Sequence, residues 1–331
     1  SSRIGWNHQQ RFDSRSSLNV GIDYATSTSV IQQNTVNPFL ATAQLNSSVN
    51  FDQRFAWGAL SLGGTYQQNL QNDVINMTLP SINLTPSPVN IGRSITWSPG
   101  LTFRNNQTSN NPTTVEVVEA PGARDTVQYD TRTTTFTFQT PLRIGRWNWS
   151  NSFLVIDQTS DQQRQFVLPD PSGPADTVVF ARTFSTGVDW QTGINLPQLF
   201  SGSWKLQPGV AIVNTTSAGP FMLRNQFSDG EYVRQGKRLQ FNLGMRPTLF
   251  GFFPGVGPLA RIRHSFSPIV DYRYAPAATV PDAYVRVVDP TGTALNARSD
   301  PQQTISVGLS QSFEGKVRAP GQDSSDAASG R

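Results

Sequence analysis

Apolar and polar residues alternate in segment after segment of this chain, and no other feature limits its possible folds as much. In the stretch RHSFSPIVDYRYAP, residues 263–276, aromatic and aliphatic side chains alternate with arginine, serine and aspartate. Successive side chains of a β-strand point to opposite faces, so each such segment predicts a strand with one apolar and one polar face. The same pattern recurs at residues 18–24, 42–55, 60–70, 95–104, 135–139, 147–155, 188–196, 204–212, 238–249 and 304–314. With two further segments near residues 4–8 and 74–85, the sequence predicts about thirteen strands and an all-β fold.

The length of these segments and the chemistry of their polar faces favour a membrane barrel. Many are long enough for the roughly 9 to 11 residues that a tilted membrane strand requires, whereas strands of globular proteins average about five or six. The polar positions are mostly Asn, Gln, Ser, Thr and Gly with some Arg, and the whole chain has only four Glu. A water-filled lumen suits such a face, while the solvent face of a soluble sheet normally carries many Lys and Glu. We therefore predict a transmembrane antiparallel β-barrel, with a secreted or surface β-sandwich adhesin as the alternative.

Composition excludes several other classes of protein. Hydrophobic residues make up 36% of the 331 residues, and no run of about 18 apolar residues could form a transmembrane helix. Cysteine does not occur, which excludes disulfide scaffolds and thiolate metal sites. The formal net charge of +4 is spread over many segments without a basic tract, so we expect no nucleic-acid partner.

Short and long connections alternate between the predicted strands. The short ones include residues 13–15, 72–73 and 145–146, and the long polar ones cover residues 26–40, 105–127, 157–178, 214–235 and 276–301. Outer-membrane barrels show this asymmetry, with short periplasmic turns and long external loops. We predict that residues 1–316 form barrel strands with long external loops, and that residues 317–331 form a polar loop or a truncated connection.

Residues that could carry chemistry are few, and we predict no catalytic, metal or cofactor site. His8 and His264 are the only histidines, and neither an HxH spacing nor a G-x-S-x-G elbow accompanies them. The acidic stretches DPSGPAD (170–176) and DPTG (289–292) lack the carboxylate spacing of a calcium loop and are typical of turns. We therefore expect a protein that is not an enzyme and needs no cofactor.

Arginines on the predicted polar faces are the best candidates for a functional site. They are Arg54, Arg104, Arg238, Arg246, Arg261, Arg263 and Arg273, with Asp271 beside them; Arg11 fits the polar file less clearly. Guanidinium groups bind phosphate in a bidentate manner, so a lumen dotted with arginine could pass or hold a phosphorylated glycan. Alternatively, and in our preferred interpretation, the arginines pair with Asp23, Asp52, Asp189 and Asp271 and brace the lumen.

Residues 263–276 allow the two faces of one strand to be assigned. We expect Phe266, Val270 and Tyr272 to face lipid, and we expect Arg263, Asp271 and Arg273 to face the lumen. Proline removes a hydrogen bond from the sheet, so Pro268 predicts a local break in this strand, as Pro99, Pro208 and Pro247 do in others.

Three groups of segments, taken in their order, carry a resemblance to a known family. The first is GWNHQQRFDSRSSLNVGIDYATSTSV at residues 5–30. The second is MTLPSINLTP at residues 77–86 followed by ITWSPGLTFRNN at residues 95–106. The third is RHSFSPIVDYRYAP at residues 263–276 followed by ISVGLSQSFEGK at residues 305–316. Together they extend over most of the chain, and they resemble the barrel region of the LptD family of lipopolysaccharide-assembly proteins.

The resemblance implies a Gram-negative outer-membrane barrel that moves lipopolysaccharide into the outer leaflet and performs no chemistry. It also implies a plug lipoprotein similar to LptE and a periplasmic bridge of transport proteins as partners. The family barrel has about twice the predicted number of strands, so the chain resembles roughly its central half and would not close alone. The lack of cysteine departs from family members that carry disulfides. A general porin or receptor barrel, which shares the composition but not the ordered motifs, is the other alternative.

Overall fold

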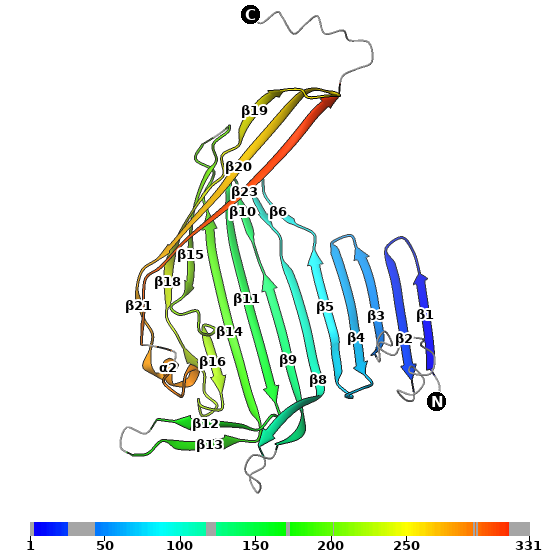
Figure 1. Cartoon of the computed structure of the whole chain (residues 1–331), viewed down its shortest axis with the longest axis vertical. Helices are drawn as coiled ribbons and strands as arrows, with labels where there is room; N and C mark the ends of the chain where they lie inside the picture. The colour runs from blue at the N-terminus through cyan, green and yellow to red at the C-terminus, as the bar shows by residue number, and fades with distance from the viewer. Residues whose placement is uncertain are drawn as a thin grey trace, which may run out of the picture. The chain divides into compact units, whose positions relative to one another are not determined.

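The computed structural model describes residues 3–25, 44–116, 124–169, 173–200, 202–293, 295 and 297–317, which are nearly all antiparallel β-strand (Figure 1). Thirteen of the described strands have nine or more residues, which agrees with the predicted number. They are β1 (Arg3–Arg11), β2 (Ser16–Ala25), β3 (Gln44–Phe55), β4 (Gly58–Asn69), β5 (Ile75–Pro86), β8 (Gly100–Glu116), β9 (Arg124–Gln139), β11 (Trp147–Ser160), β14 (Thr183–Asn195), β15 (Leu206–Asn214), β18 (Lys237–Met245), β20 (Leu259–Ala275) and β23 (Gln302–Val317).

Shorter elements fill the connections. They are β6 (Val89–Ile91), β7 (Ile95–Trp97), β10 (Leu142–Ile144), β12 (Arg164–Leu168), β13 (Asp176–Phe180), β16 (Met222–Asn225), β17 (Val233–Arg234), β19 (Leu249–Pro254), β21 (Ala278–Thr279), β22 (Arg298–Ser299) and the helix α2 (Asp282–Val288). Within the described ranges, no helix has the length and apolar character needed to cross a membrane.

The chain divides into two compact units. The first unit contains Ser1–Gly193, Ile212–Arg238 and Ala277–Asp300, and the second contains Ile194–Ala211, Leu239–Pro276 and Pro301–Arg331. Each is described by itself below.

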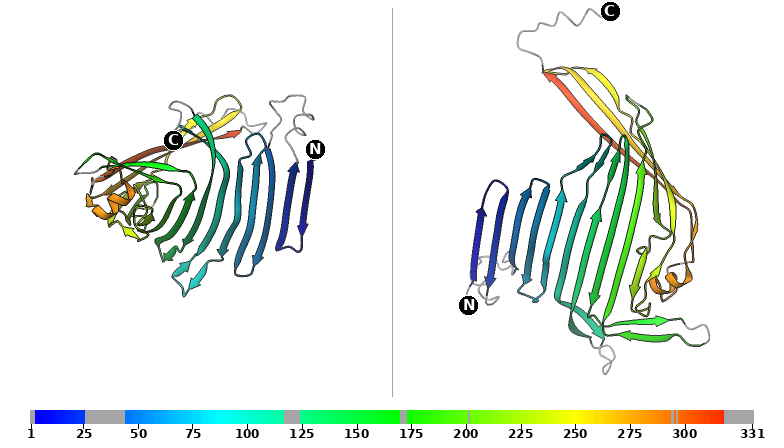
Figure 2. Two further views of the ribbon diagram at one scale, coloured as in Figure 1. Left: turned by 90° about the horizontal axis from the view of Figure 1, so that it is seen from below. Right: turned by 180° about the vertical axis from the view of Figure 1, so that it is seen from behind.

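The long strands of the first unit form an antiparallel meander. β1 pairs with β2, β2 with β3, β3 with β4 and β4 with β5. β5 then pairs with β8, β8 with β9 and β9 with β11, and Figure 2 shows the same order of neighbours from two other sides. Each long strand thus pairs in antiparallel orientation with the next one along the chain, as is usual for strands that are neighbours in sequence.

The turn between β1 and β2 shows how the sequence closes these hairpins. The Asp13 carboxylate accepts hydrogen bonds of 2.6 Å from the backbone N–H groups of Arg15 and Ser16 and from the Ser16 hydroxyl. The Ser16 hydroxyl is the largest cause that lowers the pKa of Asp13, followed by the Arg15 N–H. An aspartate at the start of a turn therefore satisfies the backbone groups that the reversal leaves unpaired.

The apolar faces of the described strands are not covered by a second layer. Val307 on β23 is 74% exposed, Phe313 on β23 is 65% exposed and Trp6 on β1 is 48% exposed. A soluble sandwich would bury such a face under a second sheet. The exposed apolar face and the single large sheet are consistent with an all-β barrel whose outer face contacts lipid.

In the second unit, β20 pairs with β23 along almost its whole length, from Leu259 opposite Val317 to Ala275 opposite Gln302. β20 continues through Pro268, which lies opposite Leu309, so the predicted break interrupts neither this strand nor its pairing with β23. The interruption falls instead on the other neighbour of β20. There β18 stops pairing at Met245 and β19 resumes at Leu249, so no continuous strand lies opposite the proline on that side.

Several predicted long loops contain regular structure. β8 and β9 extend far into residues 105–127, and they pair as far as Glu116 opposite Arg124. β12 and β13 form a hairpin of their own within residues 157–178, and Figure 1 shows it standing away from the sheet. β16 and β17 occupy part of residues 214–235, and α2 part of residues 276–301. Because these segments are rich in turn-forming residues, the sequence did not indicate the short strands within them. Residues 26–40, 170–172 and 318–331 lie outside the described residues, so the connection, turn and tail predicted there are not tested.

A small apolar core holds the connection between β20 and β23 in the first unit. Tyr284 and Val287 of α2 are buried against Leu223 of β16, and Val280 before the helix is buried with them. Tyr284 is fully buried, and burial raises its pKa to about 12. Seven residues are too few to form a stable helix in isolation, so packing against this core stabilises α2.

Candidate anion-binding sites

Three of the predicted residues meet in one hollow of the second unit. Arg246, Asp271 and Arg273 line it together with Lys205, and its volume is about 400 Å³. The register explains the convergence, because Gly244 lies opposite Asp271 and Asn242 opposite Arg273 on the polar face of β18 and β20. We name this site the Arg273 hollow.

The Arg273 hollow carries more positive than negative charge. Lys205, Arg246 and Arg273 supply three positive charges and Asp271 one negative charge among its lining residues, a net of +2. The only ion pair between them that is within 4 Å joins Arg246 Nη2 to Asp271 Oδ1 at 3.9 Å, with the arginine side chain 63% exposed. An exposed pair at this distance is weak. The hollow can therefore accept an anion without first breaking a strong internal contact.

Two polar features shape the floor of this hollow. A Cβ atom at Gly244 would lie 2.9 Å from Asp271 Oδ1, so glycine leaves the space that the carboxylate occupies. The Asn242 Oδ1 atom, which lines the same hollow, is buried and has no hydrogen-bond partner within the described residues. An unpaired buried acceptor is costly, and a ligand or water with a donor group would relieve that cost.

A second cationic hollow, which we name the Arg54 hollow, lies at the β1–β2 turn of the first unit. Arg11, Arg15 and Arg54 line a volume of about 560 Å³ together with Asp13 and Asp52. Both carboxylates are engaged, Asp13 by the turn and Asp52 by Asn50 Nδ2 at 2.6 Å and Ser61 Oγ at 2.5 Å. Among the described contacts, none of the three guanidinium groups has an ion-pair partner within 4 Å. The hollow does not test the predicted role of these arginines. It does place Arg11, whose position on the polar face the sequence left less clear, in the same hollow as Arg54.

The structure separates the other predicted arginines from these two hollows. Arg104 lines a polar hollow between β3, β4, β5 and β8 with no other charged residue. Arg238 is buried and donates a hydrogen bond of 3.1 Å from Nη1 to the Asp300 carbonyl. Arg261 and Arg263 stack over Phe252 and Phe250 at 4.9 and 4.5 Å. Arg263 also lies 3.4 Å from Glu314.

Among Asp52, Asp189 and Asp271, the bracing interpretation fits the described contacts at Asp271. Asp271 pairs with Arg246, as predicted. Asp52 instead contacts Asn50 and Ser61, and Asp189 pairs with Lys237 at 3.5 Å. The sequence interpretation paired Asp52 and Asp189 with arginines, but their partners are asparagine, serine and lysine. Strand register rather than residue type decides which side chains become neighbours.

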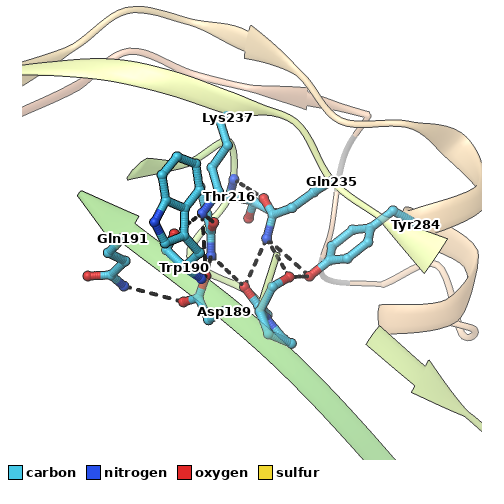
Figure 3. A network of polar contacts seen from close by, with 10 residues as sticks. Asp189, Trp190, Gln191, Thr216, Gln235, Lys237 and Tyr284 are labelled. Carbon is cyan, nitrogen blue, oxygen red and sulfur yellow. Dashed lines mark hydrogen bonds and ion pairs between the residues drawn. The ribbon is translucent and has the colours of Figure 1, made fainter. Parts of the chain in front are cut away.

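The Lys237 contact belongs to a buried polar network that the sequence did not reveal (Figure 3). The Lys237 ammonium donates to the Trp190 carbonyl and to Asn214 Oδ1, and its side chain is only 14% exposed. It also lies 4.7 Å from the centre of the Phe221 ring. A partly buried cation held by a carboxylate, two further oxygens and an aromatic face has all its donors paired, which indicates a structural role.

Gln235 joins this network to helix α2. Its Nε2 donates to the Gly219 and Pro220 carbonyls and to the Tyr284 hydroxyl, while its Oε1 accepts from the Thr216 N–H at 2.8 Å. The Tyr284 hydroxyl in turn donates to the Pro220 carbonyl. Figure 3 shows Gln235 between Tyr284 and Thr216. The connection before β18 and the one before β23 are therefore held to one another by hydrogen bonds.

The two histidines stack on aromatic rings in separate units. His8 lies parallel to Trp6 at 5.4 Å, and His264 lies parallel to Phe313 at 4.1 Å. Neither lines one of the hollows described above. Among the described residues, no group of three or more His, Cys, Asp or Glu side chains could hold a metal ion.

Comparison with known families gives the assignment that this geometry alone does not. The family model described as LptD protein matches residues 1–329 of the chain. The chain belongs to the LptD family. LptD-family proteins act in lipopolysaccharide transport and assembly, are outer-membrane components and are not known as enzymes. Neither the curated proteins nor the solved structures contain a significant match.

Family membership confirms the resemblance inferred from the ordered segments. The match covers nearly the whole chain, including residues 263–276 and 305–316 on which the resemblance was based. It also makes the adhesin and the general porin the less supported alternatives, because each shares only the composition and the alternating strands of the LptD family.

Proposed function

We propose that this chain is part of the wall of an outer-membrane β-barrel that translocates lipopolysaccharide and inserts it into the outer leaflet of a Gram-negative cell. The coarse assignment rests on the family match over residues 1–329. The observation that carries the finer proposal is the Arg273 hollow, a cationic site on the polar face of membrane-length strands.

The chemistry of this hollow suits a phosphorylated glycan. Arg246 and Arg273 can each present parallel N–H donors to two phosphate oxygens, and Lys205 adds a compact positive charge. A polar face of Asn, Gln, Ser and Thr supports the sugar portion without tight binding, as a transport path requires. The hydrocarbon chains of the substrate would instead meet the apolar face of the same strands.

The proposal includes the partners that the family resemblance implies. A plug lipoprotein similar to LptE would occupy the lumen of the complete barrel, and a periplasmic bridge of transport proteins would deliver the glycolipid. The polar face of β18, β20 and β23 is the surface that such a plug would contact. In the proposed barrel, residues 1–316 form the wall with its loops and residues 317–331 form a connection.

Depletion of the protein in cells tests this function. Lipopolysaccharide at the cell surface should fall on depletion and return when the wild-type gene is expressed. The double variant Arg246→Ala/Arg273→Ala should restore it only partly, whereas Arg182→Ala, which removes an exposed arginine paired with Asp161, should restore it fully. Unchanged surface lipopolysaccharide on depletion, with loss of small-solute uptake instead, would favour the porin alternative.

A further inference from the structure

A third hollow lies on the polar face of the first unit and differs in chemistry from the two cationic ones. Its volume is about 420 Å³, within the range of about 300–1,000 Å³ that ligand pockets occupy. Arg164 is the only charged residue that lines it among the described residues. Its other polar lining groups are hydroxyls and amides, so a strongly charged ligand has little to bind there.

The strand register builds this hollow from three neighbouring strands. Thr131 of β9 lies opposite Ser160 of β11, and Thr133 lies opposite Gln158. β14 lies next to β11, and the Thr186 hydroxyl of β14 donates to the Asp157 carboxylate of β11 at 2.7 Å, so these two side chains share one face. Their neighbours Ser185 and Gln158 therefore share the opposite face, which lines the hollow. These five side chains therefore form one continuous polar surface near the β12–β13 hairpin.

Most of these groups have hydrogen-bonding capacity to spare. Within the described part of the chain, Thr131, Thr133, Gln158 and Ser185 make no side-chain hydrogen bond, and Ser160 accepts only one, from the Gln162 N–H at 3.2 Å. Gln226 also lines the hollow, and its Oε1 atom is buried without a partner. A hydroxyl can both donate and accept, and an amide offers both functions side by side.

Aromatic rings complete the site. Tyr129 and Phe166 line the same hollow. The Tyr129 hydroxyl accepts a hydrogen bond of 2.6 Å from Asn111 Nδ2, which leaves its own proton available. Phe166 is held at right angles to Phe227 at 5.0 Å, so its position is fixed. Rings of this kind offer a flat apolar surface beside polar groups.

We propose that this hollow binds a neutral sugar unit. Each sugar hydroxyl can both donate and accept a hydrogen bond. The free hydroxyl and amide groups of Thr131, Thr133, Gln158 and Ser185 offer the complementary acceptors and donors. The C–H face of a pyranose ring fits against Tyr129 or Phe166. The proposal deepens the proposed function and rests on it, since lipopolysaccharide would supply such sugars to the polar face of the barrel.

Binding of a lipid-free oligosaccharide to the purified full-length protein in detergent tests the site. The probe is core oligosaccharide released from lipopolysaccharide by mild acid, with and without enzymatic removal of its phosphates, and binding is measured by isothermal titration calorimetry. The wild type should bind both forms with similar affinity. Thr131→Val/Thr133→Val removes two hydroxyls at nearly constant volume and should weaken binding about tenfold.

A matched control lies on the same strand and the same face. Thr135→Val/Thr137→Val changes the next two threonines of β9, which do not line the hollow, and should leave the affinity unchanged. Heat-modifiable migration on semi-native gels confirms that both variants fold. No binding to the wild type, an equal loss in both variants, or affinity that vanishes with the phosphates would each overturn the proposal. These outcomes are independent of the depletion experiment, which tests export itself.

Discussion

Replacing Val270 by arginine tests which face of β20 meets lipid. Val270 lies opposite Met245 of β18 and Val307 of β23, so a guanidinium there would be flanked by apolar side chains on both neighbouring strands. An arginine on the lipid face near the bilayer midplane costs about 2–4 kcal/mol. This cost lowers the folding equilibrium constant by about 30- to 900-fold.

The assay compares folded barrel in the outer membrane with total protein by heat-modifiable migration, and measures urea unfolding of the purified protein in detergent. Val270→Arg should accumulate less folded protein and lose about 2–4 kcal/mol of unfolding free energy. Ser267→Arg is the matched control, because Ser267 points to the polar face, where its hydroxyl contacts Thr248 Oγ1 at 3.3 Å. It should lose less than about 1 kcal/mol. Equal losses in the two variants would show that the faces are assigned wrongly.

Three further predictions concern the first unit. Lys237→Met should lower the unfolding free energy by about 2 kcal/mol, because it removes the ammonium donor from partly buried Asp189, from the Trp190 carbonyl and from Asn214, and combining it with Asp189→Asn should recover part of that loss in the same urea titration. Below pH 10 the contribution of neutral Tyr284 to stability is complete, and it should be lost as the pH rises toward its folded pKa of about 12. Limited proteolysis of residues 276–300 should detect the loss of helix packing, and Tyr284→Phe should remove the pH dependence in this range. The pKa of Asp13 is lowered by the Ser16 hydroxyl and the Arg15 N–H, so the β1–β2 turn should loosen as the pH falls below about 4. Hydrogen exchange at Ser16 should report it, and an unchanged exchange rate in Asp13→Ala would contradict it.

The structure confirms those parts of the fold that local pattern controls. Period-two alternation predicted about thirteen strands, among them residues 263–276 within β20, because a strand places neighbouring side chains on opposite sides whatever surrounds it. The hairpin at Asp13 follows from turn chemistry in the same way. The ordered segments also indicated the LptD family, which the family match confirms.

Short strands and the helix in the long connections could not be predicted, since their stability comes from contacts distant in sequence. Helix α2 has seven residues and depends on Leu223, which lies far from it along the chain. The effect of Pro268 could not be predicted either, because the cost of its missing N–H depends on whether a strand lies opposite it. On one side of β20, pairing with β18 ends at Met245 and pairing with β19 begins at Leu249, so no strand residue pairs with the proline there.

The sequence by itself determined that this protein is built of membrane-length antiparallel strands with polar and apolar faces, and it named Arg246, Asp271 and Arg273 as residues of one polar face. Only the tertiary structure decided that these three meet Lys205 in one hollow, that Arg238 is buried apart from it, and that Thr131, Thr133 and Gln158 form a separate uncharged hollow. The physical reason is register: alternation fixes the face of each residue, whereas the pairing of strands fixes which residues on that face become neighbours.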